Sequence, residues 1–299
     1  MATTVVVTGA AGNVGGKLAR RLREAGVGVR AIGRSAGRLA DLTALGAETL
    51  IGDLDDADFL TRAFTDADAA FLLLPPSPGS PDYRAEQRQL VARYVEAVAR
   101  AQLPRVLTLS SVGAELAEGT GPIAGLHDLE EALNALPWLH VQHLRPAYFM
   151  DNHLASIGLV KAQGILGSAI RADTPFAQVA TPDIAVYAAM VLQAPTFTGR
   201  SVQYLTGPRD YTMKDVARIL GAAIGRPDLT YVTFPPEATK SALMGAGMSS
   251  SVAGLYVEMM EALGEGRILP LQPRESGAGT PTTLEQFAEE VFAPAYRAA

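Results

Sequence analysis

The feature that most limits the possible folds is a glycine-rich turn near the N-terminus. The run Thr8-Gly9-Ala10-Ala11-Gly12-Asn13-Val14-Gly15 follows the β-branched segment Val5-Val6-Val7 and precedes a helix-like segment that starts near Lys17. In such a turn the first glycine allows a sharp bend, the second lets the backbone approach a ligand, and the third allows close strand–helix packing. Free N–H groups at the positive end of the helix then attract a diphosphate. The turn predicts a dinucleotide site, with an ordinary glycine-rich strand–helix turn as the alternative.

Short apolar runs alternate with helical segments over the first 145 residues. We expect strands at 4–8, 27–32, 48–51, 69–74, 105–110 and 139–144, with helices at 14–25, 36–45, 57–64, 82–101 and 126–135. Parallel strands need crossover connections, so this alternation indicates a parallel sheet that is covered on both faces. The segments Val5-Val6-Val7 and Phe71-Leu72-Leu73-Leu74 are continuously apolar, as is typical of strands buried on both faces.

The regular alternation weakens after Arg145-Pro146. We expect helices near 183–192, 213–224, 252–263 and 284–292, and strands near 202–205 and 229–233. The sequence therefore predicts an α/β fold of the Rossmann type, with a doubly wound parallel sheet over residues 1–150. Residues 151–299 are expected to form a smaller α/β substrate lobe over the carboxyl edge of the sheet, with the chain crossing between the lobes more than once.

Composition narrows the function classes. The net charge of −6 argues against a nucleic-acid partner, and the absence of cysteine removes disulfides, thiolate catalysis and thiolate metal sites. No apolar run reaches the roughly 18 residues of a membrane span, and a strand-like run begins almost at once, so we expect a cytoplasmic protein without a signal peptide. No metal site is expected: His140 and His143 point to opposite faces of one strand, and His153 is expected in the core or at the surface.

The choice between NAD and NADP depends on the end of the second strand. Arg34 stands 19 residues after Gly15, where an acidic residue would hydrogen-bond the ribose of NAD, and Arg38 follows one helical turn later. A guanidinium can bind a 2′-phosphate through two donors, so NADP is favoured over two solvated arginines as the alternative. Asp53, at the end of the third strand, is positioned to meet the adenine amino group. The nearby Asp55, Asp56 and Asp58 are expected to cap the next helix.

Together these motifs resemble the short-chain dehydrogenase/reductase superfamily, and specifically its NmrA-like branch. The segments that carry the resemblance are Thr8–Gly15, Gly33-Arg34, Gly52-Asp53-Leu54, Leu109–Ala114 and Leu144–Asn152. The resemblance implies that NADP(H) lies in a cleft between a Rossmann lobe and a C-terminal substrate lobe. It also implies that Leu73, Leu74 and Pro75 line the path of the cofactor, and that Tyr148 and Phe149 flank its nicotinamide end. The cofactor contacts expected in all are Thr8, Gly9, Ala11, Gly12, Asn13, Val14, Gly15, Arg34, Arg38, Asp53, Leu54, Leu73, Leu74, Pro75, Ser110, Tyr148 and Phe149.

The catalytic pattern departs from that superfamily. Its catalytic members use a tyrosine with a lysine four residues later, and none of the nine tyrosines here has one. His127 and Glu131, one turn apart, instead resemble the histidine–glutamate pair of quinone- and azo-reductase-like members. We expect His127 to donate a proton, Glu131 to orient it, and Ser111 to hydrogen-bond the substrate. In the alternative interpretation, His127 caps or is solvated on its helix and Glu131 pairs elsewhere.

Three classes of function follow from these expectations. The first is an NADPH-dependent oxidoreductase that transfers hydride to a quinone, an azo compound or a similar conjugated small molecule. The second is a non-catalytic NADP(H)-binding redox sensor of the NmrA type, which the missing tyrosine–lysine pair favours; an isomerase or lyase on the same scaffold is a third. The expected partner is a small-molecule substrate, with a homodimer or a regulatory protein partner as further possibilities.

Overall fold

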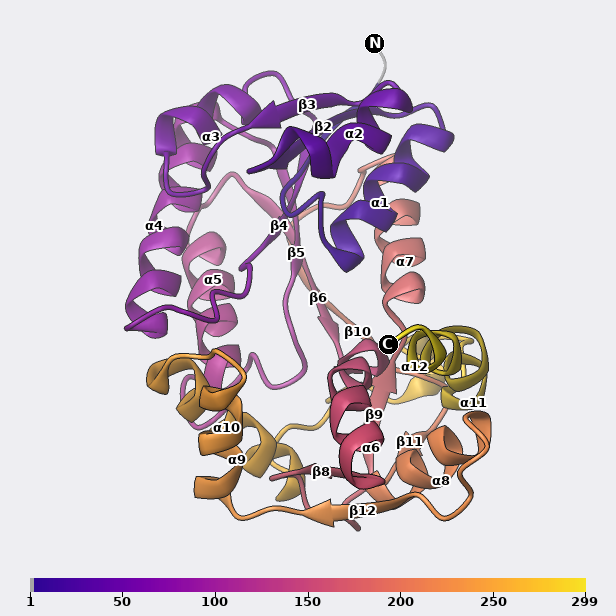
Figure 1. The fold of residues 1–299 in the computed structure, drawn as a ribbon. Coiled ribbons are helices and arrows are strands. Elements are labelled where there is room, and N and C mark those ends of the chain that lie inside the picture. The colour runs from indigo at the N-terminus through magenta and orange to yellow at the C-terminus, as the bar shows by residue number, and fades with distance from the viewer. Residues whose placement is uncertain (1–2) are drawn as a thin grey trace.

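The computed structural model describes residues 3–299, and a seven-stranded parallel sheet forms the centre of this part of the chain (Figure 1). Its strand order is β10-β6-β5-β4-β1-β2-β3. The strands are β1 (Thr4–Val7), β2 (Gly28–Gly33), β3 (Glu48–Ile51), β4 (Ala69–Leu73), β5 (Arg105–Leu109), β6 (His140–Pro146) and β10 (Arg200–Leu205). The expected doubly wound α/β fold of the Rossmann type is confirmed.

Helices cover both faces of this sheet, as crossover connections require. The helices on one face are α1 (Asn13–Glu24), α2 (Ala36–Ala44) and α7 (Thr181–Gln193), and those on the other are α3 (Ala57–Phe64), α4 (Tyr83–Ala101) and α5 (Ala124–Asn134) (Figure 1). The side chains of Val5 and Val7 lie in one hydrophobic cluster, and that of Val6 lies in the other. All three are fully buried. The unbroken valine run thus has an apolar environment on both faces of the sheet.

A second group of elements lies beyond the carboxyl ends of the strands, in the lower part of Figure 1. It contains a sheet of β7 (Tyr148–Phe149), β9 (Phe176–Val179) and β11 (Asp210–Tyr211), and a parallel pair of β8 (Ile165–Ser168) and β12 (Thr230–Thr233). Its helices are α6 (Ile157–Gln163), α8 (Met213–Ala223), α9 (Pro236–Gly245), α10 (Ser250–Gly264), α11 (Leu284–Phe287) and α12 (Ala293–Ala298), with the further turns η2 (Met150–Ser156) and η4 (Ala288–Phe292). We refer to these elements as the second lobe.

The chain returns from this lobe to the main sheet. Helix α7 packs against α1, and β10 pairs in parallel with β6. Residues 181–205 therefore belong to the sheet layer, although they fall within the range 151–299 that we assigned to the second lobe. The two lobes are connected through several chain segments rather than through one linker.

Helix α10 is held against the edge of the first lobe by close backbone contacts. Gly121, in the short turn η1 (Gly121–Ile123), has a φ of +61°, and a Cβ atom there would lie 3.1 Å from the Met259 nitrogen and closer still to the Leu255 carbonyl oxygen. At the start of the helix, the Ser249 N–H donates to the Pro78 carbonyl at 2.8 Å. Helix α10 is therefore fixed beside the segment that follows β4.

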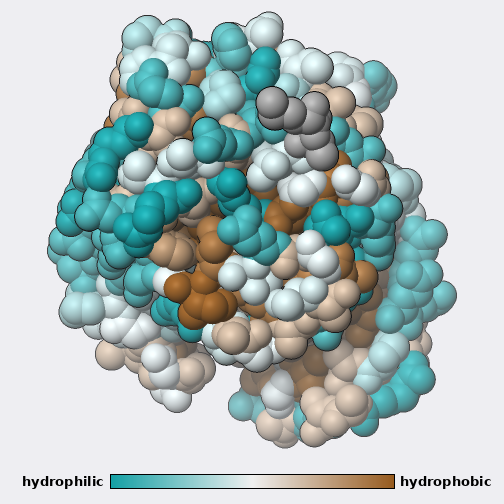
Figure 2. Space-filling view, turned by 90° about the horizontal axis from the view of Figure 1, so that it is seen from above, coloured by the Kyte–Doolittle hydropathy of each residue, from teal (hydrophilic) through white to brown (hydrophobic). Residues whose placement is uncertain are grey.

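The surface seen from above is mostly hydrophilic toward the margins, and hydrophobic residues gather toward the middle and lower part of the view (Figure 2).

Within residues 3–299, no helix combines the length and the hydropathy that a membrane crossing needs. The same residues contain no group of three or more His, Asp or Glu side chains that could hold a metal ion.

Candidate functional site

The glycine turn lies where the order of the strands reverses. Strand β1 has β2 on one side and β4 on the other, so the chain winds away from β1 in both directions. In open α/β sheets, ligands bind in the crevice outside the carboxyl ends of the strands at such a point. Gly9 follows β1 with a φ of +61°, and its carbonyl accepts a hydrogen bond from the Gly12 N–H at 2.8 Å. The sequence thus places this glycine turn at the topological switch point.

A side chain would be crowded at each of the three glycine positions. A Cβ on Gly9 would lie 2.8 Å from Leu73 Cδ2, and one on Gly12 would lie 3.2 Å from the Gly9 carbonyl oxygen. A Cβ on Gly15 would lie 3.0 Å from the Thr8 carbonyl oxygen and closer still to that of Gly9. Gly12 is also the N-cap of α1 and supplies no side-chain acceptor, and the first turn of the helix contains no acidic residue. This cradle of backbone therefore fits a diphosphate.

The end of β4 is fixed beside the turn. The Thr8 hydroxyl donates to the Phe71 carbonyl at 3.0 Å and accepts from the Leu73 N–H at 3.2 Å. The Tyr94 hydroxyl donates to the Leu73 carbonyl at 2.9 Å, and the Tyr83 hydroxyl donates to the Pro75 carbonyl at 3.2 Å. Leu73, Leu74 and Pro75 are half-buried. They lie at the second side of the switch point, where the resemblance implied a path for the cofactor.

The two arginines that favoured NADP are both exposed. Arg38 donates from Nη2 to the Ala11 carbonyl at 3.0 Å, so it braces the outside of the glycine turn. It also lines a surface hollow of about 440 Å³ together with Gly12, Asn13 and Lys17. Arg34 follows the end of β2 and does not line this hollow. The contact of Arg34 and Arg38 with a 2′-phosphate stays a prediction.

The acidic residues after β3 form hydrogen bonds within their own segment and at the start of α3. Asp53 is exposed and accepts from the Asp55 N–H at 3.1 Å, and Leu54 beside it is half-buried. Asp56 is the N-cap of α3 and accepts from the Phe59 N–H at 2.9 Å. The expected capping role of this run is confirmed for Asp56, while the contact of Asp53 with adenine stays a prediction.

Sequence reasoning missed a link between the turn and the second lobe. Lys17 donates from Nζ to the Asn13 carbonyl at 3.0 Å and to the Thr181 hydroxyl at 3.1 Å. Thr181, the first residue of α7, in turn donates from its hydroxyl to Asp151 at 2.8 Å. The first turn of α1 is thereby joined to η2 and to the start of α7.

His127 is held by a backbone carbonyl. Its Nδ1 lies 2.9 Å from the carbonyl oxygen of Ala114, and because a carbonyl can only accept, Nδ1 carries the proton. Nε2 is then the nitrogen that can accept or deliver a proton. Glu131 is exposed, and within residues 3–299 no hydrogen bond or ion pair joins it to His127. We expected Glu131 to orient the His127 imidazole, but in the structure the Ala114 carbonyl does so.

The neighbouring Glu130 occupies a buried ionic cluster instead. Arg145 donates to it from two nitrogens, Nε to Oε1 at 3.0 Å and Nη2 to Oε2 at 2.6 Å. The Ser110 hydroxyl donates to the same carboxylate. Glu130 and Arg145 are 3% and 8% exposed. Burial alone would raise the pKa of Glu130, but the hydrogen bond from Arg145 helps to bring that pKa below its usual range. Glu130 is therefore ionised. The Ser110 hydroxyl, which we expected to contact the cofactor, uses its hydrogen in the bond to Glu130.

The third nitrogen of Arg145 extends the cluster toward the loop after β5. Nη1 donates to Glu115 Oε2 at 2.8 Å and to the Tyr204 hydroxyl at 2.9 Å. Ser111, the expected substrate contact, is half-buried and donates to the carbonyl of Val112 at 2.9 Å. That serine hydroxyl still has lone pairs with which it can accept a hydrogen bond.

His143 lies behind this cluster and is held neutral. Its Nδ1 and the Thr108 hydroxyl are 2.8 Å apart, and its Nε2 lies 3.2 Å from Asn134 Oδ1. The two contacts fit one neutral tautomer, in which Nδ1 accepts and Nε2 donates. Burial lowers the pKa of His143 to about 4, against the opposing effect of the Glu130 charge. This histidine therefore has a structural role.

Tyr148 is enclosed by aromatic rings on the small sheet. Its ring centroid lies 5.5 Å from that of His153 and 5.5 Å from that of Phe176, which meets it edge-on. Burial raises the pKa of the Tyr148 phenol, so the group stays protonated and is a weak acid. His153 lies 2.8 Å from Gln178 Oε1, and burial lowers its pKa to about 4. His153 is buried, so of the two placements expected for it, core or surface, the structure shows the core. Phe149, next to Tyr148, is half-buried.

A comparison with known families agrees with this arrangement. The model of the NmrA-like family matches residues 1–288. The chain belongs to the NmrA-like family.

Three similar proteins are reductases by name. An NAD(P)H azoreductase of Xenophilus azovorans is 27% identical over 257 residues, which is 85% of each chain. A (4-alkanoyl-5-oxo-2,5-dihydrofuran-3-yl)methyl phosphate reductase of Streptomyces griseus is 29% identical over 298 residues, covering 97% of this chain and 99% of that protein. The crystal structure of an NADPH-dependent quinone oxidoreductase from Escherichia coli with NADPH superimposes with a TM-score of 0.82 at 21% identity, over 96% of this chain and 99% of that one.

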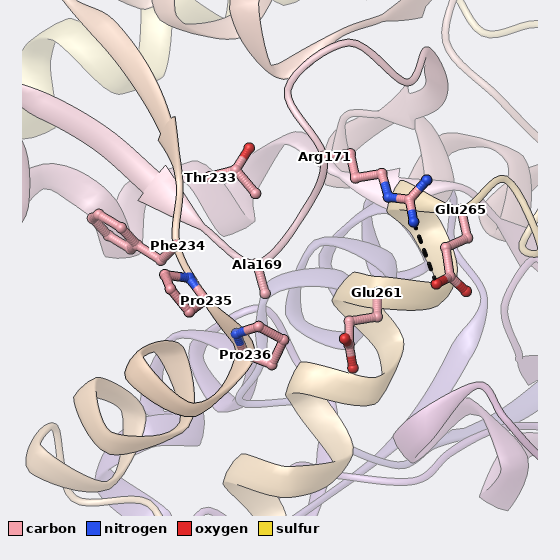
Figure 3. Close-up of a pocket in the computed structure, with 8 residues that line it drawn as sticks. All are labelled: Ala169, Arg171, Thr233, Phe234, Pro235, Pro236, Glu261 and Glu265. Atoms are coloured by element: carbon pink, nitrogen blue, oxygen red, sulfur yellow. Dashed lines mark ion pairs between the residues drawn. The ribbon is translucent and has the colours of Figure 1, made fainter.

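The second lobe of this NmrA-like chain has a separate surface hollow of about 340 Å³ (Figure 3). Its apolar wall contains Phe234, Pro235 and Pro236, and the ion pair of Arg171 and Glu265, 3.7 Å apart, lies on its other side. None of the residues expected from the sequence to contact cofactor or substrate lines this hollow.

One member of the ionic cluster, Glu130, could have been recognised from the sequence. Leu126, Leu129 and Leu133 form the apolar face of α5, and Glu130 falls on the same face at helical spacing. A carboxylate in an apolar stripe needs a buried partner, because an isolated buried charge is costly. The sequence does not name that partner, since Arg145 and Glu115 come from other segments.

We predict that His143 couples folding to pH. The pKa of His143 is about 4 in the folded protein and 6.5 ordinarily. Between these pH values, His143 is therefore protonated in the unfolded chain and neutral in the folded one. The free energy of unfolding should therefore fall as pH drops from about 6.5 to 4, by on the order of 1–3 kcal/mol from this group. His143→Gln should flatten this dependence in denaturant titrations across the window. An unchanged slope in the variant would contradict the assignment.

Proposed function

We propose that this chain is an NADPH-dependent reductase that transfers hydride to a quinone, an azo compound or a similar conjugated acceptor. The observation that carries the proposal is the glycine cradle at the switch point, where a Cβ on Gly9, Gly12 or Gly15 would crowd its neighbours. The names of the three similar proteins support the reaction class.

The residues present fit the dinucleotide. When bound, NADPH supplies a hydride from its nicotinamide ring. The backbone N–H groups that begin α1 would hold the diphosphate, and Leu73 would pack beside the turn against which it already lies. Arg34 would pair with the 2′-phosphate, since a guanidinium binds phosphate through a planar pair of donors.

His127 is the candidate proton donor. A conjugated acceptor that receives hydride becomes an anion and needs one proton to give the neutral product. The Nδ1–H group of His127 is occupied by Ala114, so Nε2 is the atom from which a protonated imidazole would deliver that proton. Tyr148 is less suited to the step, because its phenol pKa is raised and no lysine stands four residues later.

The class of acceptor follows from the weakness of this acid machinery. Without a tyrosine–lysine pair, a ketone of ordinary reactivity would receive little help from a general acid. Quinones, azo bonds and unsaturated carbonyl compounds accept hydride more readily, because the negative charge spreads over the conjugated system. The acceptors in the names of the three similar proteins share this property.

We predict that Arg34 sets the preference for NADPH over NADH. Protein fluorescence titrations should show tighter binding of NADPH, and Arg34→Ala should weaken NADPH by about 10–100-fold, as the loss of a charged hydrogen bond implies. NADH binding should change little. Arg62→Ala, which removes another exposed arginine from α3, is the matched control and should behave as wild type.

Equal or tighter binding of NADH by the wild-type protein would remove the argument from Arg34. Loss of both nucleotides in Arg34→Ala would mean that the residue supports the fold rather than the 2′-phosphate.

We predict that turnover depends on His127. With a panel of quinones, azo dyes and unsaturated carbonyl compounds, NADPH consumption should be acceptor-dependent, and His127→Ala should lower kcat by about 10²–10⁴-fold. The dissociation constant of NADPH should stay unchanged. His140→Ala, at the amino end of β6, provides a histidine control.

Full activity in His127→Ala would exclude this residue from the chemistry. Tight NADPH binding without reduction of any acceptor would support the non-catalytic redox sensor instead.

A further inference from the structure

We propose that Arg145 and Glu115 are positioning residues that set the proton-bearing nitrogen of His127. The inference rests on the proposed function for its chemical meaning, but its structural part can be measured without turnover. Within residues 3–299, neither residue forms a hydrogen bond with His127. Their effect would pass through the loop and the helix that hold the imidazole.

The first path runs through the loop after β5. The Ala114 carbonyl that accepts from His127 belongs to the residue directly before Glu115. The Glu115 carboxylate is held by Arg145 Nη1 at 2.8 Å, and the Tyr204 hydroxyl lies 3.4 Å from it. Gly113 precedes this pair with a φ of +91°, a conformation that favours glycine. The loop thus has a turn that favours glycine on one side and an ionic anchor on the other.

The second path runs through α5, the helix that carries His127. Glu130 lies three residues after His127, so the two side chains leave neighbouring positions on the helix surface. Both oxygens of Glu130 are held by Arg145, at 3.0 and 2.6 Å. The rotation of α5 about its axis is therefore fixed from the sheet.

Arg145 can serve both paths because its partners come from different parts of the sheet and its surroundings. It lies on β6, and its partner Tyr204 comes from β10, the strand beside it. Ser110, which follows β5, donates to the same Glu130 carboxylate that Arg145 holds. Arg145 is 8% exposed, and its guanidinium uses three nitrogens in the cluster. Lysine could not reproduce this geometry, since it presents a single nitrogen.

The consequence for His127 is a fixed tautomer. A free neutral imidazole in water prefers the proton on Nε2, whereas the contact with Ala114 requires it on Nδ1. A loop released from Arg145 would let the imidazole lose this contact and return to the mixture of the two tautomers that exists in solution. The ring would then no longer be held by Nδ1 in the one orientation from which Nε2 delivers its proton.

The first test is ¹⁵N NMR of the imidazole of His127 in the full chain. Wild type should show the Nδ1–H tautomer at a pH where the ring is neutral, and Glu115→Ala should shift it to a mixture with Nε2–H. Glu118→Ala removes an exposed carboxylate from the same loop and should keep the wild-type signal. Glu115→Gln retains an oxygen that can accept from Arg145 and should restore most of it. A wild-type signal in Glu115→Ala would overturn the inference.

The second test is a double-mutant cycle in kcat with an accepted quinone or azo dye. Glu115→Ala should lower kcat by at least about 10-fold and leave the NADPH dissociation constant unchanged, yet add nothing in the His127→Ala background. An equal loss in both backgrounds would show a general structural role and overturn the inference. Absence of any turnover in wild type would contradict the proposed function alone, because the NMR result stands without it.

Discussion

The close approach of α1 to the end of β1 is the constraint on which the site depends. Gly15 lies against the carbonyl groups of Thr8 and Gly9 so tightly that a methyl group could not be added. This contact places the N-terminus of α1 at the switch point of the sheet, beside the end of β4. His127 contacts the loop that follows the carboxyl end of β5, and Tyr148 lies directly after the carboxyl end of β6. The dinucleotide and the acceptor would therefore meet along one edge.

Much of the first lobe could be predicted because its signals are local. The strands and helices expected within residues 1–145 are present with ends within two residues of the expected ones. The run Val5-Val6-Val7 indicates a strand buried on both faces, and the spacing of Gly9, Gly12 and Gly15 predicts the turn that follows it. The second lobe was less accessible. Strands such as β7 and β11 have two residues each, too few to show a period, and α9, which starts at Pro236, is absent from the helices expected from the sequence.

The candidate catalytic groups show why a site is harder to predict than a fold. A histidine with a carboxylate one turn later suggested that Glu131 orients His127, yet the acceptor is the main-chain oxygen of Ala114, which no sequence pattern encodes. The adjacent Glu130 proved to be the buried carboxylate, paired with Arg145 from a neighbouring strand. Partners of this kind meet only after the sheet has formed, so periodicity can identify one member of the pair and not the other.

The central claim is that main-chain N–H groups at the start of α1 hold the diphosphate of NADP(H). A crystal structure of the chain with bound NADP⁺ tests it most directly. We expect density for the two phosphates next to residues 12–15, with the 2′-phosphate near Arg34 and the nicotinamide toward Tyr148. Density for the nucleotide at another place, with nothing beside this turn, would contradict the account.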